Sequence, residues 1–406
     1  MFKRLFMRWE VKKTSLRGRL LRGLVALTLA TAIWIPSLHF FFTRNVGDFR
    51  QPVGLSPKAE QLAARHLQLW TDPKLREREL CRMRVSNAEW DFMGRTFLVW
   101  SLADMGLRNP AARQDYLRVM DQIIDETLRL EKEHGMYFFL MPYATAGSYV
   151  VQPARSLFLD SEIAMMLASR RMLEEKPEYR PLLKERVDAM VAQMERGPIL
   201  AAESYPNECW TFDNTAALAA MRMEDYLDGT DHSAFVRRWV ASAKKNLTDP
   251  KTGILISSFT LSGEALEGPE GSSIWMVAHF LRLADGDFAR DQYARAKKEL
   301  GRKMMGFAWS GEWPDSWRGG ANIDSGPVIP VLDISAGASG MAFIGAGSFG
   351  DDNYLTGLAA TLDFSGFPSR HAGQLKYCAS NQVGDAALLY AAVLGPLWER
   401  IEKAKP

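Results

Sequence analysis

The sequence predicts an all-α protein, an (α/α)6 toroid that follows one transmembrane helix. Three observations lead to this fold class. Twelve helix-like segments occupy residues 57–401, polar residues gather at the start of every second segment, and one long uncharged run lies near the N-terminus. The chain has 406 residues, of which 47 % are apolar and 24 % charged, so it can form one large core. The net charge of +2 gives no indication of nucleic-acid binding.

The N-terminal segment has the features of a membrane anchor. Residues 24–42 contain no Lys, Arg, Asp or Glu, and nineteen residues are close to the length that a helix needs to cross a bilayer. Eight basic residues precede this run and should stay in the cytoplasm: Lys3, Arg4, Arg8, Lys12, Lys13, Arg17, Arg19 and Arg22. We therefore expect a cytoplasmic tail (1–23), a signal anchor in the inner, cytoplasmic membrane (24–42), a linker (43–56) and a periplasmic or extracellular domain (57–406).

A cleaved signal peptide is the alternative interpretation of this segment. Ala30-Thr31-Ala32 resembles a small-residue cleavage site. The apolar run, however, continues beyond it through Ile33 to Phe42, which favours a single-pass anchor that is not removed.

The domain after the linker is predicted to be helical along most of its length. Apolar residues recur at three- and four-residue spacing, for example at Leu98, Leu102 and Met105. One short hairpin strand is expected at 254–261, after a turn at 249–253. The expected helices lie near residues 57–70, 87–106, 110–133, 154–174, 179–196, 212–228, 233–246, 272–285, 287–303, 335–348, 352–363 and 382–402.

The even-numbered helices differ in composition from the odd-numbered ones. Small residues dominate at 215–220, 337–347 and 386–395, whereas 185–188 and 295–298 are highly charged. Small side chains let helices approach closely, as an inner ring requires, and charged helices suit an outer ring that faces water. This alternation favours a toroid over a simple bundle, and no short sequence repeat indicates a solenoid.

Polar and aromatic residues precede or begin all six even-numbered helices. These segments are 87–91, 155–162, 205–214, 267–273, 322–333 and 377–385. Because inner helices of a toroid start at one face, their carboxylates, hydroxyls and rings should converge there, as acid–base catalysis requires. Our candidate catalytic residues are Asp213, Asp324, Glu208 and Glu270. Our candidate substrate-binding residues are Tyr205, Cys209, Trp210, Asn214, His279 and Asn381.

Several of these residues also have a structural interpretation. Asp213 or Asn214 could equally cap a helix, and Asp324 could organise a turn through its own backbone. A histidine like His279, one to two turns into a helix, is more typical of a satisfied core residue. The pair Asp91 and Arg95, four residues apart, indicates a structural ion pair.

Asp160 and Glu162 lie on different faces of one helix, so we expect at most one of them to point inward. The three cysteines, Cys81, Cys209 and Cys378, form no C-x-x-C motif, and six histidines form no H-x-x-x-H cluster. We therefore expect no metal and no cofactor.

From Asp91 onward, and most clearly over 205–300, the chain resembles the linalool dehydratase/isomerase family. Asn214 and the Asp324-x-Gly326 loop also fall in matching order. The matching residues are Gly229-Thr230-Asp231, Ala234, Arg237, Trp239, Leu247, Asp249-Pro250 and Gly253.

This resemblance implies an (α/α)6 barrel and cofactor-free acid–base chemistry on an allylic alcohol. It also implies positions for the active-site groups. The family's cysteine pair corresponds to Ser204 and Asp213 here, and its active-site histidine to Asp160 or Ser161. The acids of this pocket would then be carboxylates.

The leading hypothesis is a membrane-anchored, extracytoplasmic enzyme that dehydrates, hydrates or isomerises a hydroxylated, terpenoid-like or lipid-like substrate. The second is a carbohydrate-active enzyme, a hydrolase, lyase or epimerase, acting on a glycan. The third is a non-catalytic binding protein. The expected partners are a small-molecule or glycan substrate and the membrane, without nucleic acid, and oligomerisation is left open.

Overall fold

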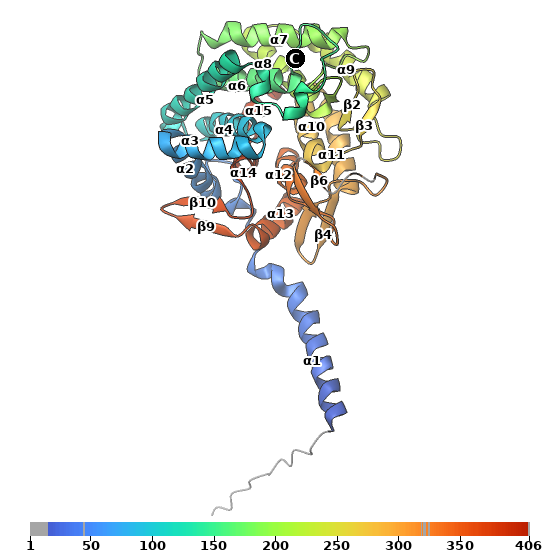
Figure 1. The fold of residues 1–406 in the computed structure, drawn as a ribbon. Helices are drawn as coiled ribbons and strands as arrows, with labels where there is room; N and C mark the ends of the chain where they lie inside the picture. The colour runs from blue at the N-terminus through green and yellow to red at the C-terminus, as the bar shows by residue number, and fades with distance from the viewer. Residues whose placement is uncertain (1–14, 44, 318, 320–321, 324, 405–406) are drawn as a thin grey trace, which may run out of the picture.

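Six helices form a closed inner ring. In the computed structural model, which describes residues 15–43, 45–317, 319, 322–323 and 325–404, each inner helix packs against the next and the last packs against the first. Figure 1 shows this ring face-on. Its members are α4 (Ala88–Arg108), α6 (Leu157–Leu173), α8 (Thr211–Asp228), α10 (Gly271–Ala284), α12 (Ala336–Phe349) and α14 (Gln382–Val393). This closure confirms the predicted toroid.

A second layer of helices surrounds the ring. Outer helices alternate with inner helices along the chain: α2 (Pro57–Thr71), α5 (Arg113–His134), α7 (Tyr179–Arg196), α9 (Ser233–Asn246), α11 (Gly286–Glu299) and α13 (Asp352–Ser365). A further helix, α3 (Pro73–Ser86), packs on α4, and α15 (Pro396–Lys403) closes the end of the ring at which α4 and α6 terminate. There, the amide of Leu397 donates to Asp104 at 3.0 Å, and Arg400 donates to the carbonyl of Met172 at 3.1 Å.

Residue size and polarity explain the two layers. Every residue of α6 is buried, whereas α5 buries one face only. Small residues bring the inner helices together: a Cβ on Gly345 would meet the Trp275 side chain at 2.9 Å. Asn87 and Ser335 fix helix starts by accepting amide hydrogen bonds as N-caps of α4 and α12. The predicted contrast between even- and odd-numbered helices is therefore confirmed.

Short antiparallel strands lie in the connections between the helices of the toroid. They form a sheet of order β1-β2-β3, a sheet of order β4-β5-β8-β7-β6 and the hairpin β9-β10. Cys209 pairs with Phe259, and Gly301 pairs with Ser310. The strands are β1 (Cys209–Trp210), β2 (Ser258–Phe259), β3 (Ala265–Glu267), β4 (Gly301–Met304), β5 (Phe307–Ser310), β6 (Asn322–Ile323), β7 (Gly326–Ile329), β8 (Ile334–Ser335), β9 (Pro368–His371) and β10 (Gln374–Tyr377). Single 3-10 turns are η1 (Leu38–Phe41), η2 (Val46–Asp48), η3 (Pro110–Ala112), η4 (Met136–Phe138) and η5 (Pro142–Thr145).

One apolar helix stands apart from the toroid. Helix α1 (Leu16–Ser37) buries none of its residues, and Figure 1 shows it leaving one side of the ring. With η1 it forms a segment, Leu16–Phe41, that is long and apolar enough to cross a membrane, as a signal sequence would also be. The helix begins eight residues before the expected run and so includes Arg17, Arg19 and Arg22 in its first turns.

Three expectations about helix boundaries were wrong. The single helix expected at 382–402 is two helices, because Gly395 has φ 132° and Pro396 starts a new helix. Residues 73–86 form α3, started by Asp72 as N-cap and Pro73, in a segment for which no helix was expected. The helix expected to reach residue 303 ends at Glu299, where β4 begins its hairpin with β5.

Candidate functional site

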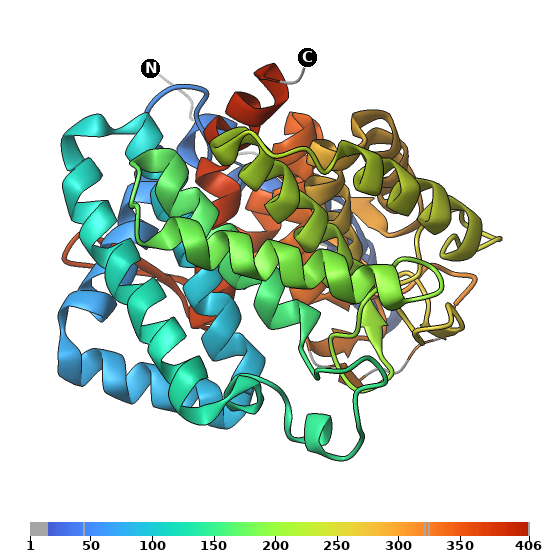
Figure 2. The same cartoon turned by 90° about the horizontal axis from the view of Figure 1, so that it is seen from above.

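A cavity of about 550 Å³ lies at the end of the ring where α4, α8 and α10 begin. Figure 2 shows the loop between α5 and α6 extending beyond the helices at this end. Among the described lining residues five carry carboxylates and none is a Lys, Arg or His. The carboxylates are Glu89, Glu208, Asp213, Glu267 and Glu270. The other lining residues are Trp90, Met93, Tyr143, Phe158, Tyr205, Trp210, Phe212, Ser258, Leu266, Ser272, Ser273, Trp313 and Ser325.

Asp213 lies in the first turn of α8. It is 4 % exposed, and the Ser204 hydroxyl donates a hydrogen bond to its carboxylate. Burial raises the pKa of Asp213 to about 8, although the Ser204 hydrogen bond opposes the rise. The nearby charges of Glu89 and Glu208 raise that pKa further. Asp213 therefore holds a proton at neutral pH. It is not a helix cap, because the N-cap position of α8 belongs to Trp210.

Glu208 and Trp210 face the cavity from β1 and the residue before it. The indole N–H of Trp210 donates to Glu208 at 2.5 Å. Side chains alternate along a strand, so Cys209 points to the other side, where it is completely buried. Burial raises the pKa of the Cys209 thiol, which keeps it protonated and disfavours a nucleophilic role. All three cysteines are free.

Tyr205 connects the loop before α8 with the start of α4. Its hydroxyl donates to the Glu89 carboxylate and accepts the amide hydrogen of Met141 at 3.0 Å. The ring of Tyr143 stacks on that of Tyr205, with centroids 4.6 Å apart. Burial and the Glu89 charge raise the pKa of Tyr205, so the phenol is neutral. The cavity wall thus presents a neutral hydroxyl held in one position.

Glu270 occupies the N-cap position of α10, where its side chain makes no capping hydrogen bond. It lines the cavity and is 4 % exposed. Its amide donates to the Ser257 hydroxyl at 2.8 Å, and that hydroxyl is 2.7 Å from the Ser273 hydroxyl. These contacts fix the backbone of Glu270 and hold its carboxylate at the cavity.

Two predicted substrate-binding residues maintain the structure instead of lining the cavity. The Asn214 side chain accepts from the amide of Ala202 at 3.2 Å and donates to the carbonyl of Trp210 at 2.8 Å, which ties down the loop before α8. Asn381 is the N-cap of α14, accepting from the amide of Gly384 at 2.9 Å.

His279 also lies outside the cavity, and Asp324 lies outside the described residues. His279 is fully buried in α10, with its ring nitrogens 2.6 Å from the Ser348 hydroxyl and 2.8 Å from the Tyr390 hydroxyl. Burial lowers the pKa of His279 well below its usual value, so it is a neutral, satisfied core residue.

Glu162 is a candidate acid that sequence reasoning did not select. It lies on α6, is fully buried, and neither carboxyl oxygen has a hydrogen-bond partner of good geometry among the described residues. Burial raises its pKa well above the usual value, the nearby Thr96 hydroxyl lowers it, and Asp213 and Glu89 raise it again. Glu162 is therefore a second buried acid whose protonated form is favoured by burial and by the charge of Asp213. Asp160 on the same helix forms ion pairs with Arg155 and Arg186.

Glu89 and Glu267 were also not selected, although both lie in segments that the sequence marks as polar. Glu89 lies two residues after the cap residue Asn87. Nothing in the sequence around Glu89 indicated that the Tyr205 hydroxyl would contact it. The expected ion pair of Asp91 and Arg95 is confirmed, with 3.0 Å between Oδ1 and Nε. Among the described residues, no three His, Cys, Asp or Glu side chains are grouped to hold a metal ion.

A sequence model of the linalool dehydratase/isomerase family matches residues 172–383, slightly more than half of the chain. The chain belongs to this family. Comparison with curated proteins gives no match. Two similar solved structures are a family 105 glycoside hydrolase of C. acetobutylicum and a family 76 α-mannanase of Bacteroides thetaiotaomicron. Both are 12 % identical. The first covers 79 % of this chain and 98 % of its own, with TM-score 0.45, and the second 77 % and 87 %, with TM-score 0.46.

The positions implied by the family resemblance are brought together in part. Ser204 and Asp213, which correspond to the family's cysteine pair, are hydrogen-bonded to each other. Asp160 and Ser161, which correspond to its histidine, do not line the cavity. Asp160 is engaged by Arg155 and Ser161 donates to a backbone carbonyl, whereas the next residue, Glu162, lies beside Asp213.

Proposed function

We propose that this member of the linalool dehydratase/isomerase family catalyses dehydration, hydration or isomerisation of an apolar hydroxylated substrate by acid–base chemistry. The observation that carries the proposal is Asp213, whose pKa of about 8 makes it a proton donor at neutral pH in a cavity with four further carboxylates. The family match supports the reaction type.

In the dehydration direction, Asp213 donates its proton to the substrate hydroxyl. The C–O bond breaks and its electron pair leaves with water. A carboxylate then takes a proton from the neighbouring carbon, and the C–H electron pair forms the new double bond. Asp213 ends as a carboxylate and the base ends protonated, so proton transfer from base to acid restores the site. Hydration is the same sequence in reverse.

Glu208 and Glu270 are our proposed bases, with Asp324 retained as a candidate whose geometry is not described. Glu208 accepts the Trp210 indole N–H, a bond that favours its ionised form. Glu270 is held on the opposite, α10 side of the loop cluster by its backbone contacts. Tyr205 donates its only hydroxyl proton to Glu89, so its fixed oxygen is suited to orient the substrate by accepting the substrate's hydroxyl proton.

The rest of the lining favours an apolar substrate such as an allylic terpenoid alcohol. Aromatic residues from four elements and one loop line the cavity with the carboxylates: Trp90, Phe158, Trp210, Phe212 and, in the loop, Trp313. Aromatic faces stabilise positive charge, as at an allylic carbon that is losing water. Concave sites lined by rings with a few placed polar groups are typical of small-molecule binding.

The test compares Asp213→Asn with Asp385→Asn in the full-length protein. Asp385 is a matched control, because it is also a buried aspartate in the first turn of an inner helix but pairs with Arg65 and does not line the cavity. Products from terpenoid and other allylic alcohols are measured by gas chromatography, with oligosaccharides, including uronates, as the second panel.

We expect Asp213→Asn to lose activity at least about 100-fold, the usual worth of a general acid, and Asp385→Asn to retain it. Wild-type activity should fall as the pH rises through about 8, because Asp213 loses its proton. Full activity of Asp213→Asn would refute the assignment. Turnover of oligosaccharides instead would favour a carbohydrate-active enzyme, and binding without turnover a non-catalytic binding protein.

We also propose that α1 anchors the protein in the inner membrane, with the catalytic domain outside the cytoplasm. Its 22 residues span about 33 Å as a helix, close to the thickness of the hydrocarbon core. Retention in membranes after alkaline extraction, and digestion of the domain by protease added outside the cytoplasmic membrane, test the two parts. Release by alkali would exclude an integral anchor.

A further inference from the structure

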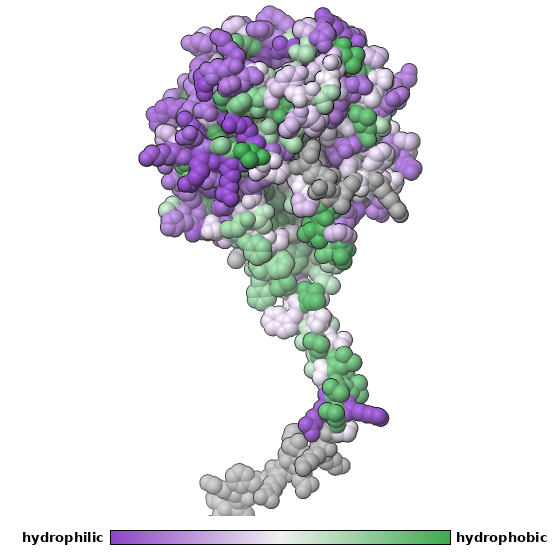
Figure 3. Space-filling model, in the orientation of Figure 1, coloured by the Kyte–Doolittle hydropathy of each residue, from purple (hydrophilic) through white to green (hydrophobic). Residues whose placement is uncertain are grey.

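A patch of exposed apolar side chains surrounds the place where α1 meets the domain. We define this basal patch by six residues from three segments that are far apart in sequence. They are Phe40 and Phe41 of η1, Met304 and Met305 at the β4–β5 turn, Phe364 in the last turn of α13 and Phe367 just before β9, exposed by 71, 59, 44, 44, 45 and 66 % respectively. Figure 3 shows apolar colour at this junction, continuous with the surface of α1.

An aromatic cluster beneath the patch fixes α1 to the domain. The Phe42 ring lies 5.1 Å from that of Phe364 and 6.5 Å from that of Phe307, measured between centroids. His39 also packs closely on the turn residue Gly306, where a Cβ would meet the imidazole at 2.2 Å. These contacts set the direction in which α1 leaves the domain. The patch must therefore lie wherever the outer end of the membrane helix lies.

Two patch residues stand at backbone positions that suit other residue types. Met305 and Gly306, the central residues of the β4–β5 turn, both have positive φ (48° and 83°). Asn-Gly is the preferred sequence for such a turn, because Asn tolerates positive φ and its side chain is polar. Phe367 also has a positive φ, 50°, where bulky side chains are rare. Met and Phe at these positions are therefore unfavourable in two ways, in backbone conformation and in exposure to water. An apolar partner would remove the second cost.

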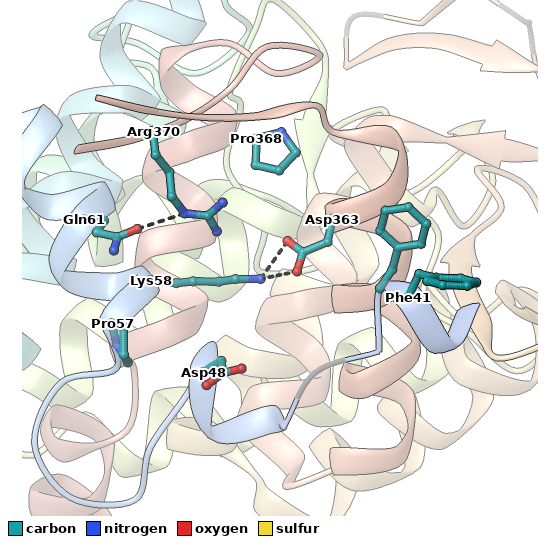
Figure 4. A pocket seen from close by; sticks show the side chains of 9 residues that line it. Phe41, Asp48, Pro57, Lys58, Gln61, Asp363, Pro368 and Arg370 are labelled. Carbon is teal, nitrogen blue, oxygen red and sulfur yellow. Dashed lines mark hydrogen bonds and ion pairs between the residues drawn. The ribbon is translucent and has the colours of Figure 1, made fainter. Parts of the chain in front are cut away.

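A second pocket, with both apolar and charged lining residues, adjoins the patch and extends away from it. This cavity of about 440 Å³ has Phe41 and Phe42 on its patch side, and its charged lining residues are Asp48, Lys58, Asp363 and Arg370. Figure 4 shows Lys58 paired with Asp363 and Arg370 reaching toward Gln61, with Phe41 at the edge. Apolar rings beside an exposed arginine match the change from acyl chains to phosphate headgroups at a bilayer surface.

We infer that the basal patch inserts into the outer surface of the membrane that α1 spans, so that the domain lies on the bilayer and is not merely tethered to it. This inference rests on the proposed membrane anchor. The partner is the lipid interface, because the patch is continuous with an apolar helix long enough to cross a membrane and is bordered by a cationic side chain.

The orientation has a consequence for substrate access. Figure 1 views the ring face-on while α1 runs away along the plane of the picture, so the ring axis lies roughly parallel to the membrane. The cavity, at one end of the ring, then opens along the bilayer surface. A lipid-soluble alcohol that partitions into the membrane would be concentrated beside this opening.

Depth-dependent fluorescence quenching of the full-length protein in vesicles of phosphatidylcholine and phosphatidylglycerol tests the inference. The exposed Cys81 and Cys378 are replaced by Ser, while the buried Cys209 stays. Single cysteines are then introduced as Met305→Cys or Phe367→Cys and labelled with an environment-sensitive fluorophore. Asp188→Cys, on α7 at the opposite side of the ring, is the matched control.

We expect lipid-borne nitroxides to quench the labels at 305 and 367 at least threefold more than the label at 188, and iodide to show the reverse order. The change Met305→Asn, which gives the turn its preferred sequence, should reduce lipid quenching at 367 while the protein stays folded. Retention of the protein in alkali-washed membranes with iodide-accessible labels at 305 and 367 would overturn the membrane contact alone. Release by alkali would overturn the anchor and the contact together.

Discussion

Asp213→Asn should stabilise the protein at alkaline pH while removing its activity. An aspartate with a usual pKa of 3.8 is held here in a buried site, where its pKa is about 8. Between these two values the folded chain keeps a proton that the unfolded chain releases. Stability from this group is therefore complete below about pH 4, falls as the pH rises, and reaches its minimum above about pH 8. Asparagine cannot ionise, so it does not incur this loss.

The size of the effect follows from the two pKa values. Each pH unit in which only the folded state holds the proton costs about 1.4 kcal/mol. From pH 5 to pH 8 this amounts to roughly 4 kcal/mol, since 8 minus 5 is three units. Asparagine can still accept the Ser204 hydroxyl, so the hydrogen bond is retained at both pH values. The free energy of unfolding of Asp213→Asn relative to wild type should therefore increase by up to about 4 kcal/mol between pH 5 and pH 9.

Denaturant unfolding of both proteins in detergent micelles at pH 5, 7 and 9 measures this difference. The comparison between variants isolates Asp213, because Glu162 and other buried acids titrate in both proteins. A difference in unfolding free energy that is the same at pH 5 and pH 9 would show that Asp213 is ionised in the folded state at neutral pH. The acid role proposed for it would then fail.

Two further predictions concern Asp213's neighbour and a buried ion pair. Ser204→Ala removes the hydroxyl that donates to Asp213 and should raise the titration midpoint of the Asp213 carboxyl by about one to two pH units, the contribution of a hydrogen bond to a charged group. Infrared or carbon-13 titration of the carboxyl groups, with Asp213→Asn to identify the signal, measures the midpoint. A lowered midpoint would contradict the assignment. Arg95→Ala leaves Asp91 buried without its partner and should lower the free energy of unfolding by about 3–5 kcal/mol. Arg118→Ala removes an exposed pair with Asp115 and should lower it by less than about 1 kcal/mol. Equal effects in denaturant unfolding would show that burial does not set the strength of these pairs.

The fold could be predicted because its signals are local and repeated. Small residues in alternate helices, as at 215–220 and 337–347, indicated an inner ring, and these segments are α8 and α12. The break at Gly395 did carry a sequence signal that the prediction did not use, because Gly395-Pro396 joins a residue that tolerates positive φ to one that is common at the first position of a helix. Of the short strands only β2, Ser258–Phe259, was expected, within the segment 254–261; the others were missed since two to four residues carry too little periodicity.

The candidate site was predicted in part, because the starts of the inner helices could be recognised in the sequence. Glu208, Asp213 and Glu270 line one cavity, as expected from their place before or at the start of inner helices. His279 and Asn214 are residue types that often occur in active sites, so the sequence could not distinguish them from site residues. Only the folded structure shows that their partners are Tyr390 and the carbonyl of Trp210. Glu162 was weighed only as an alternative to Asp160, because a glutamate within a helix ordinarily faces water and only ring closure buries it.

Asp213 and Asp285 show how three positions at the start of a helix separate a capping acid from a proton donor. Both lie at the start of a helix, where the amide groups favour negative charge. Asp285 is the N-cap of α11 and accepts the amides of Asp287 and Phe288, so its pKa is lowered although burial opposes this. Asp213 stands three residues after the N-cap of α8, and the hydrogen bond it accepts comes from the Ser204 hydroxyl. Burial then prevails, and the pKa rises. The same residue type at the same end of a helix therefore holds charge in one place and a proton in the other, according to how deeply it is buried and whether backbone amides and a cation, here Lys244, reach it.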